Sequence, residues 1–327
     1  MTAIMPPRQL RVVVRVASGP RRGFGHAVRA LRVAGALRAS VWICPDGPMP
    51  GALAPARHVT LLSEGVRALD QVRPDLLLLD TPVVADGRRW LAAARRRGIP
   101  VASIHDRGIA PLASDVAIDG SLAARGAIAG ARRSLIGPRF MVMDPQVRGR
   151  GRSAVDERLV VIALGGGPRI GLARRLAHRI VELSPEARVV IAAGFAVLRH
   201  GSAPSRHGVE WLGPQASLAT VLGRSAVAVV AGGVTLYEAA ALGVPTVAVP
   251  IVEAQRATVR AFGMAGAAIV PEVTMRVDAD AVARAVTRLL NNRRLGGRIG
   301  RRGGQLVDGR GTERVVRALC ALAGRGR

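Results

Sequence analysis

Residues 226–249 read AVAVVAGGVTLYEAAALGVPTVAV, and this stretch decides the fold class. It opens with a small, β-branched run typical of a buried strand, which Gly232 and Gly233 end. A run of helix formers follows, and Gly and Pro then precede a second β-branched run. The mostly apolar run 226–252 is long enough for a membrane span, but its glycines, Pro245, Pro250 and Glu238 argue against one. The pattern predicts strand, turn, helix, turn, strand, which is one unit of a parallel α/β sheet.

The same alternation of strand and helix patterns runs through both halves of the chain. The expected strands are 12–16, 41–44, 75–80, 100–104, 116–118, 159–164, 188–192, 209–211, 226–231 and 246–249. The expected helices are 26–38, 84–97, 170–183, 218–223, 234–242, 254–265, 278–291 and 312–323.

A polar segment rich in Gly and Arg, residues 146–157, interrupts this alternation and is interpreted as a linker. A length of 327 residues also suits about two domains. We therefore predict two doubly wound, Rossmann-like α/β domains, residues 1–145 and 158–327. They should face each other across a cleft, because ligands of such folds bind at the carboxyl ends of the strands.

Composition narrows the function classes. The formal charge is +26, and all 48 basic residues are Arg because the sequence contains no Lys. The charge favours a polyanion as partner, but the complete lack of Lys beside abundant Ala, Gly and Val indicates a genome-wide coding bias. Aromatic residues make up 2%, too few for a base-stacking platform, so no specific nucleic-acid partner is expected. Peripheral association with an anionic membrane stays open.

Cellular location is inferred from the cysteines and the N-terminus. The two cysteines, Cys44 and Cys320, are far apart, which excludes a disulfide scaffold and a CxxC-type zinc site. We expect both to be buried, reduced thiols of a cytoplasmic protein. Residues 1–9 lack the apolar core of a signal peptide, and no transmembrane segment is expected.

A glycine loop, Gly23-Phe-Gly25-His26-Ala-Val-Arg29, follows the first strand. Its glycines let the backbone approach a ligand, and the next helix offers free N–H groups to an anion. The third glycine of the dinucleotide fingerprint is missing, so a nicotinamide site is rejected. His26 lies on the first helical turn, where the helix dipole disfavours its cation, so it can serve as a neutral base. The alternative is a surface histidine without chemistry.

Two more glycine loops follow strands in the second half. They are Gly165-Gly166-Gly167-Pro168 and Ala231-Gly232-Gly233. Either loop suits a phosphate, although glycine triplets also form ordinary tight turns. Thr235 begins the helix after the second loop, and Glu238 lies one turn further on an otherwise apolar helix. Burying a lone carboxylate is unfavourable, so Glu238 needs a polar partner such as a ribose diol, unless it faces solvent.

Four motifs, in this order along the chain, resemble those of one family. They are Gly-x-Gly-His-x-x-Arg at 23–29, Pro-Asp-x-x-x-x-Asp at 74–80, Gly-Pro-Arg-Phe at 137–140, and Gly-Gly-x-Thr-x-x-Glu at 232–238 with Ala-Leu-Gly-x-Pro and Gln255 after it. The last run resembles the nucleotide-sugar half of GT-B proteins. The whole set resembles the pseudaminic-acid pathway hydrolase, UDP-2,4-diacetamido-2,4,6-trideoxy-β-L-altropyranose hydrolase, and its relatives in spore-coat polysaccharide synthesis. The resemblance covers nearly the whole chain and implies a GT-B-like fold.

The resemblance implies a reaction in the synthesis of surface glycans or nonulosonate-type sugars. Water attacks the anomeric carbon of a UDP-sugar and UDP leaves, without a cofactor or a metal. His26 is then the general base. Arg29 orients His26 or meets a phosphate, unless it is a solvated helix residue without a role. Asp80 either contacts substrate or caps its strand.

The resemblance also implies how the second domain holds the nucleotide sugar. Gly232, Gly233 and the loop with Gly165 and Gly166 face the diphosphate. In addition, Thr235 donates to a phosphate, Glu238 holds the ribose and Gln255 holds a sugar hydroxyl.

Two departures from the family pattern leave the sugar and the reaction open. Ala254 stands where the hydrolases usually have Asn, and His105-Asp106 stands where they usually have Asp-Asp. The alternatives are a glycosyltransferase that passes the sugar to a second, acceptor sugar, and a binder of nucleotide sugars or polyanions without catalysis.

Overall fold

The computed structural model describes residues 9–19, 23–49, 58–107, 111–149, 152, 154–165, 169–192, 194, 208–213, 215, 217–272 and 277–325. The chain divides into two compact units. Unit 1 comprises Met1–Gly120, Ala124–Val142 and Thr312–Arg327, and unit 2 comprises Ser121–Ala123 and Met143–Gly311.

Unit 1 is built on a seven-stranded parallel sheet with the order β3-β2-β1-β4-β5-β6-β7. The strands are β1 (Leu10–Val16), β2 (Ala39–Pro45), β3 (Val59–Leu61), β4 (Leu76–Asp80), β5 (Val101–Ile104), β6 (Val116–Asp119) and β7 (Arg133–Ile136). All of β4 is buried, which explains its unbroken run of four leucines in the centre of a sheet covered on both faces.

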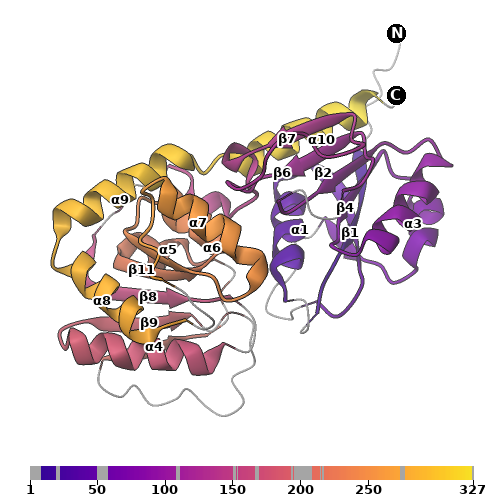
Figure 1. Ribbon diagram of the computed structural model, residues 1–327. Helices are drawn as coiled ribbons and strands as arrows, with labels where there is room; N and C mark the ends of the chain where they lie inside the picture. The colour runs from indigo at the N-terminus through magenta and orange to yellow at the C-terminus, as the bar shows by residue number, and fades with distance from the viewer. Residues whose placement is uncertain are drawn as a thin grey trace, which may run out of the picture. The chain divides into compact units, whose positions relative to one another are not determined.

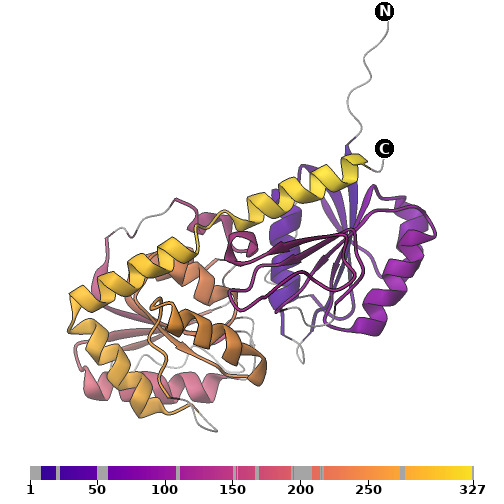
Figure 2. The same ribbon diagram turned by 45° about the horizontal axis from the view of Figure 1, so that its top comes forward.

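Helices cover both faces of this sheet, as Figure 2 shows. They are α1 (Gly25–Ala36), α2 (Ala68–Val72), α3 (Val84–Arg95) and α10 (Gly311–Arg325). Successive side chains of a strand point to opposite faces. Val12 and Val14 of β1 therefore pack with α1 and α10, while Val13 packs with α2 and α3 around Trp90.

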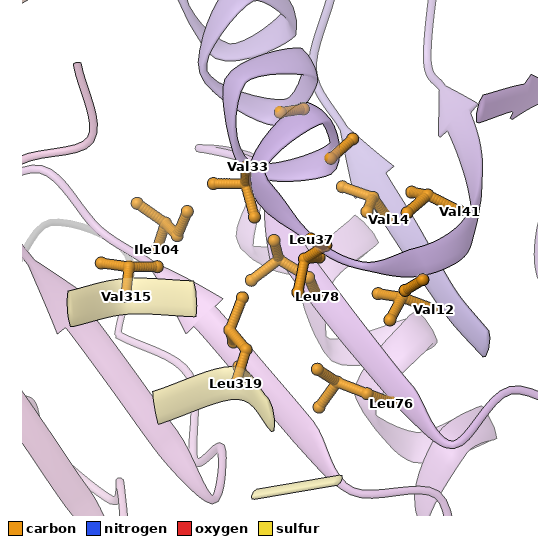
Figure 3. Close-up of a cluster of buried hydrophobic side chains, with 14 of the residues drawn as sticks. Val12, Val14, Val33, Leu37, Val41, Leu76, Leu78, Ile104, Val315 and Leu319 are labelled. Carbon is orange, nitrogen blue, oxygen red and sulfur yellow. The ribbon is translucent and has the colours of Figure 1, made fainter. Parts of the chain in front are cut away.

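Helix α10 belongs to unit 1, although it follows all of unit 2 in the sequence. Val315 and Leu319 are fully buried in the same cluster as Leu37, Leu78 and Ile104, as Figure 3 shows. The boundaries expected from the sequence placed 312–327 in the second domain. The apolar face of the helix was identified correctly, but periodicity alone does not say which sheet that face covers.

Unit 2 is built on a five-stranded parallel sheet with the order β10-β9-β8-β11-β12. The strands are β8 (Asp156–Ala163), β9 (Arg188–Ala192), β10 (Val209–Leu212), β11 (Ser225–Ala231) and β12 (Thr246–Val249). The helices are α4 (Ile170–Leu183), α5 (Ala219–Arg224), α6 (Val234–Ala241), α7 (Arg256–Met264), α8 (Ala279–Leu290) and α9 (Arg293–Leu306).

The core of unit 2 also lies on both faces of its sheet. Val160, Ile162 and Val229 pack against α4 and α8. Val161 and Ala228 point to the opposite face and are fully buried, where α6 and α7 contact β11 and β12. Figure 1 shows the order of these elements along the chain. The predicted fold class, two doubly wound α/β halves, is confirmed.

Some elements were missed by the sequence analysis. They are β3, α2, β7 and α9. Helix α9 is rich in glycine, which disfavours helix formation. The sequence pattern therefore indicated 278–291 as the penultimate helix. Its glycines serve packing against α6 and the turn after it. A Cβ on Gly300 would lie 2.1 Å from the carbonyl oxygen of Gly243, and one on Gly303 would lie 3.0 Å from the Cα of Ala240.

The expected linker, the two cysteines and the expected lack of a transmembrane segment can now be compared with the structure. The segment expected as a linker, 146–157, contains the end of a short 3-10 helix (Pro145–Val147) and the start of β8, and residues 150, 151 and 153 lie outside the described residues. Cys44 is buried, which raises the pKa of its thiol to about 12, but Cys320 is exposed on α10, so the expectation of two buried thiols is wrong. Among the described residues, no helix is long and apolar enough to cross a membrane.

Candidate functional site

A hydrogen-bonded cluster of four side chains lies at the carboxyl ends of the central strands of unit 1. His26 and Arg29 come from the first turns of α1, Asp80 is the last residue of β4, and Asp106 follows β5. In α1, positions 26 and 29 lie on one helix face at i, i+3 spacing. Because β4 and β5 are parallel neighbours, the acids after them meet at one edge of the sheet.

Asp80 is the centre of this cluster. Its Oδ1 lies 2.7 Å from Nδ1 of His26 and 2.6 Å from Nη2 of Arg29, and its Oδ2 accepts from Nε of Arg29 at 2.7 Å. Asp80 is fully buried. Burial would raise the pKa of this carboxyl, but the charges and hydrogen bonds of Arg29 and His26 hold its pKa well below the usual range.

These contacts fix the tautomer of His26. Asp80 is ionised and therefore only accepts hydrogen bonds, so Nδ1 of His26 donates to it. Nη2 of Arg29 lies 3.0 Å from the same Nδ1, but both protons of Nη2 are directed to the carboxylates of Asp80 and Asp106. Neutral His26 thus carries its lone pair on Nε2. The His26 side chain is 20% exposed, so this base is partly open to solvent.

Arg29 joins the two acids. Nη1 of Arg29 donates to Oδ1 of Asp106 at 2.8 Å, and Nη2 donates to Oδ2 at 3.2 Å. Burial alone would lower the pKa of Arg29, but Asp106 and Asp80 raise it well above its usual value. Arg29 was predicted to orient His26 or to meet a phosphate, and the structure brings it to both His26 and Asp80.

The sequence analysis missed Asp106 as a site residue. The signal was present, because an acid in the loop that follows a buried strand lies at the edge where ligands bind. The preceding residue is His105. It is buried, and its Nε2 lies 2.7 Å from the hydroxyl of Ser103, which in turn lies 2.7 Å from the hydroxyl of Ser114.

The glycine loop before α1 includes a backbone conformation that favours glycine. Gly23 has a φ of +80°, in the region that favours glycine, and Gly25 is the first, exposed residue of α1. Phe24 is the N-cap of α1, and its side chain caps no backbone N–H. The helix therefore presents its N-terminus beside His26.

In unit 2, the second glycine loop and Thr235 lie together at the carboxyl end of β11. Gly233 is the N-cap of α6, and Thr235 is its second residue. A Cβ on Gly232 would lie 2.7 Å from Val259 and 2.9 Å from Cβ of Gln255, so only glycine fits there. The loop thus brings the N-terminus of α6 beside Gln255, whose side-chain oxygen accepts from the backbone N–H of Ile251 at 3.1 Å.

Glu238 is 3% exposed, so the alternative of a solvent-facing side chain is wrong. Its Oε1 accepts from the backbone N–H of Asp144 at 3.2 Å. The preceding Tyr237 is also buried, and its hydroxyl accepts from the backbone N–H of Leu122 at 2.8 Å. The predicted polar partner of Glu238 therefore includes a backbone amide. The ribose contact stays a prediction.

The remaining loop is only partly described. Gly165 follows β8 with a φ of +87°, whereas Gly166 and Gly167 lie outside the described residues. The predicted site residues thus form two groups. His26, Arg29 and Asp80 meet in unit 1, and Gly232, Gly233, Thr235, Glu238 and Gln255 share α6 and the loops beside it in unit 2.

A groove in unit 1 lies apart from the His26 cluster. Its volume is about 740 Å³, and it lies at the amino ends of β5, β6 and β7, beside α10. Because Asp80 and Asp106 lie at the carboxyl ends of their strands, with His26 beside Asp80, the groove is not part of the candidate site.

Comparison with known proteins shows the fold of the chain and its similarity to a curated protein. No family model matches the chain. A curated protein, the spore coat polysaccharide biosynthesis protein SpsG of Bacillus subtilis, is 24% identical over 215 residues. This match covers 62% of each protein, so it spans less than two thirds of the relative.

Solved structures extend the likeness over nearly the whole chain. MurG of Acinetobacter baumannii superposes with a TM-score of 0.62 at 17% identity, covering 95% of this chain and 99% of that one. The calicheamicin glycosyltransferase CalG4 gives 0.68 at 16% identity, covering 97% and 99%. UGT2 of Phytolacca americana, solved with UDP-2-fluoroglucose and pterostilbene, gives 0.67 at 12% identity, covering 96% and 100%.

Identities this low establish the fold alone, and the fold of these proteins is GT-B. The sequence match to SpsG agrees with the resemblance drawn from the four motifs. The chain therefore has the GT-B fold and resembles the SpsG-like proteins.

Proposed function

We propose that this protein is a UDP-sugar hydrolase that acts in the synthesis of a surface glycan. The observation that carries the proposal is the hydrogen bond of His26 to the buried, ionised Asp80, which leaves Nε2 of His26 as a proton acceptor. The sequence match to a spore-coat polysaccharide protein supports the class of pathway.

In the proposed reaction, a water oxygen attacks the anomeric carbon of the sugar. One water proton passes to Nε2 of His26, and the bond between the anomeric carbon and the phosphate oxygen breaks. UDP leaves with the electron pair of that bond. A positioned general base of this kind contributes roughly 10²–10⁴-fold to the rate. The imidazolium formed on His26 is stabilised by the carboxylate of Asp80.

Unit 2 would hold the nucleotide. The N-terminus of α6 after Gly233 offers backbone N–H groups to the diphosphate, and Thr235 adds a hydroxyl. Glu238 would accept from the ribose and Gln255 would contact the sugar. The high positive charge of the chain favours the approach of a doubly negative diphosphate.

The test is release of UDP from a panel of UDP-amino sugars, with and without sugar acceptors. Release without an acceptor is the expected result. Release only in the presence of an acceptor would make the protein a glycosyltransferase, an activity that solved structures of this fold also have. Tight binding of UDP without turnover of any donor would make it a binding protein.

A variant tests the role of His26. We expect His26→Ala to keep the affinity for UDP, because the residues proposed to bind the nucleotide lie in unit 2, and to lose turnover by at least about 100-fold. His178→Ala is the matched control, since His178 is an exposed residue of α4. Equal turnover of His26→Ala and the wild type would exclude His26 as the base.

A further inference from the structure

The carboxylate of Glu238 is held by a backbone group that is distant in sequence. Its Oε1 accepts from the backbone N–H of Asp144 at 3.2 Å, and the two residues are 94 positions apart. Both residues belong to unit 2, and both are buried. A buried carboxylate needs hydrogen-bond donors, because it has lost those of water. The amide of Asp144 therefore restricts the directions in which the Glu238 side chain can point.

The backbone of Asp144 is itself fixed by its neighbours in sequence. Its Oδ1 accepts from the backbone N–H of Gln146 at 2.8 Å and caps the short 3-10 helix Pro145–Val147. A proline also confines the residue before it to extended conformations, and Asp144 has a φ of −59° and a ψ of 125°. Val147 is buried, so the end of this helix packs into the protein. These constraints hold the chain at Asp144 in one conformation.

The helix that carries Glu238 is also held in place. Tyr237 precedes Glu238 on α6, and its hydroxyl accepts from the backbone N–H of Leu122 at 2.8 Å. The ring of Tyr237 meets that of Phe262 edge-on, with 5.0 Å between the ring centroids. With α6 fixed in this way, the remaining freedom of Glu238 lies in its side-chain torsions. The bond to Asp144 constrains these torsions.

Resting on the proposed function, in which Glu238 accepts from the ribose, we propose that the backbone N–H of Asp144 is the positioning group of the ribose site. It holds the Glu238 carboxylate in the orientation that receives the ribose hydroxyls. A carboxylate accepts about four hydrogen bonds, so the amide and two hydroxyls can bond to it together. An acceptor that is already oriented loses less conformational freedom when the nucleotide binds. Asp144 thus acts through Glu238 and makes the site selective for nucleotides that carry ribose hydroxyls.

A matched pair of variants isolates the N–H of Asp144. Asp144→Pro removes this donor, and the φ of −59° is close to the value of about −65° that proline imposes. Asp144→Ala keeps the donor. Both variants lose the side-chain bond to Gln146, so the difference between them reports the N–H. Thermal unfolding checks that each variant is folded.

The experiment titrates the full chain by calorimetry with UDP and with 2′,3′-dideoxyuridine 5′-diphosphate, which lacks both ribose hydroxyls. The ratio of the two affinities is the ribose preference. We expect this preference to be roughly tenfold smaller in Asp144→Pro than in Asp144→Ala, the effect of one hydrogen bond to a charged group. The affinity for the dideoxy nucleotide should not differ between the two variants, because that ligand offers Glu238 no hydroxyl.

Tyr237→Phe is the control for a general loosening of α6. It removes the bond to the backbone N–H of Leu122 and leaves the amide of Asp144 in place. We expect this variant to lose stability and to keep the ribose preference of the wild type.

Amide hydrogen exchange tests the same contact without the proline substitution, and so covers a failure of Asp144→Pro to fold. The amide of Asp144 should exchange at least about tenfold faster in Glu238→Ala than in the wild type, whereas the amide of Leu122 should keep its rate. Tyr237→Phe should have the reverse effect. In the wild type, saturating UDP should slow exchange at Asp144, and the dideoxy nucleotide should not.

Neither measurement requires turnover, and the outcomes separate the inference from the proposed function. A wild-type protein without a ribose preference, or a preference that Glu238→Ala keeps, overturns the ribose contact of Glu238 and the inference with it. A preference that Glu238→Ala abolishes, but that is equal in Asp144→Pro and Asp144→Ala, overturns the inference alone. Equal exchange at Asp144 in the wild type and in Glu238→Ala also overturns it.

Discussion

Nδ1 of His26 lies 2.7 Å from Oδ1 of Asp80, and this carboxylate is fully buried at the end of β4. Here the acid has no access to solvent, and Arg29 holds it in one orientation. The pair therefore fixes the imidazole in the tautomer that a general base requires.

We expect Asp80→Asn to lower turnover by about 10²–10⁴-fold, because an amide no longer enforces the tautomer or stabilises the imidazolium. The affinity for UDP should not change, since the residues proposed to bind UDP lie in unit 2. Steady-state kinetics and calorimetric titration with UDP measure the two effects. Turnover above half of the wild-type value would contradict the role of Asp80.

The free energy of unfolding of unit 1 should depend on pH through the carboxyl groups of Asp80 and Asp106. The pKa values of Asp80 and Asp106 are both lowered in the folded protein: burial would raise them, but Arg29 lowers them more. The unfolded chain, with aspartate pKa values near about 3.9, therefore takes up protons first as the pH falls. The stabilisation is present above about pH 4 and is lost progressively below it.

Urea unfolding followed by tryptophan fluorescence measures this dependence. Trp42 and Trp90 lie in unit 1, and Trp211→Phe removes the signal of unit 2. The difference in free energy of unfolding between pH 6 and pH 3.5 should be smaller in Asp106→Asn than in its parent. An equal difference would show that Asp106 is not ionised more readily in the folded state.

The packing of α9 on α6 can be tested with two glycine substitutions in α9, one at the contact and one away from it. A Cβ on Gly300 would meet the backbone of Gly243, so we expect Gly300→Ala to destabilise unit 2 by about 1–3 kcal/mol. A Cβ on Gly297 would meet only the end of the Arg301 side chain. Gly297→Ala should therefore stabilise the helix by up to about 1 kcal/mol.

Urea unfolding followed by far-UV circular dichroism distinguishes the two. The two substitutions are expected to change the free energy of unfolding in opposite directions. If both variants were equally stabilised, the close approach of α9 to the turn at Gly243 would not exist in solution.

The assignment of α10 to unit 1 is tested at Leu319. Its side chain is fully buried among residues of β1, β4 and α1, and Leu319→Ala should reduce the free energy of unfolding of unit 1 by about 2–5 kcal/mol. Arg317→Ala, on an exposed position of the same helix, is the control. The fluorescence of Trp90 reports the transition of unit 1. A loss of stability confined to unit 2, followed through Trp211, would contradict the assignment.

The parts of the fold that the sequence predicted are those with a strong local pattern. The strands that begin near Val12 and Ala226 and the strand that ends at Asp80 were identified because each is largely buried in a parallel sheet and therefore has a nearly continuous apolar run. Helix α9 was missed because its glycines serve contacts with Ala240 and Gly243, which are distant in sequence.

In the candidate site, too, the sequence identified residues by local pattern but not the contacts between them. The sequence singled out His26, Arg29 and Asp80, but the 2.7 Å contact between His26 and Asp80 depends on the spatial order of β1 and β4. Glu238 was recognised as an acid that needs a partner, whereas its bond to the backbone of Asp144 depends on tertiary structure. Local patterns thus identify candidate residues, and long-range pairing determines which of them meet.

The return of α10 to unit 1 has a consequence for synthesis on the ribosome. Val14 is translated early, and Val315 of the same buried cluster follows about 300 residues later, so the core of unit 1 stays open at Leu78 and Ile104 while unit 2 is made. Contacts so distant in sequence form slowly, because a long loop must close first. Unit 2 can thus fold on emergence, while the half that is made first must wait for the last helix and expose apolar surface to chaperones until then.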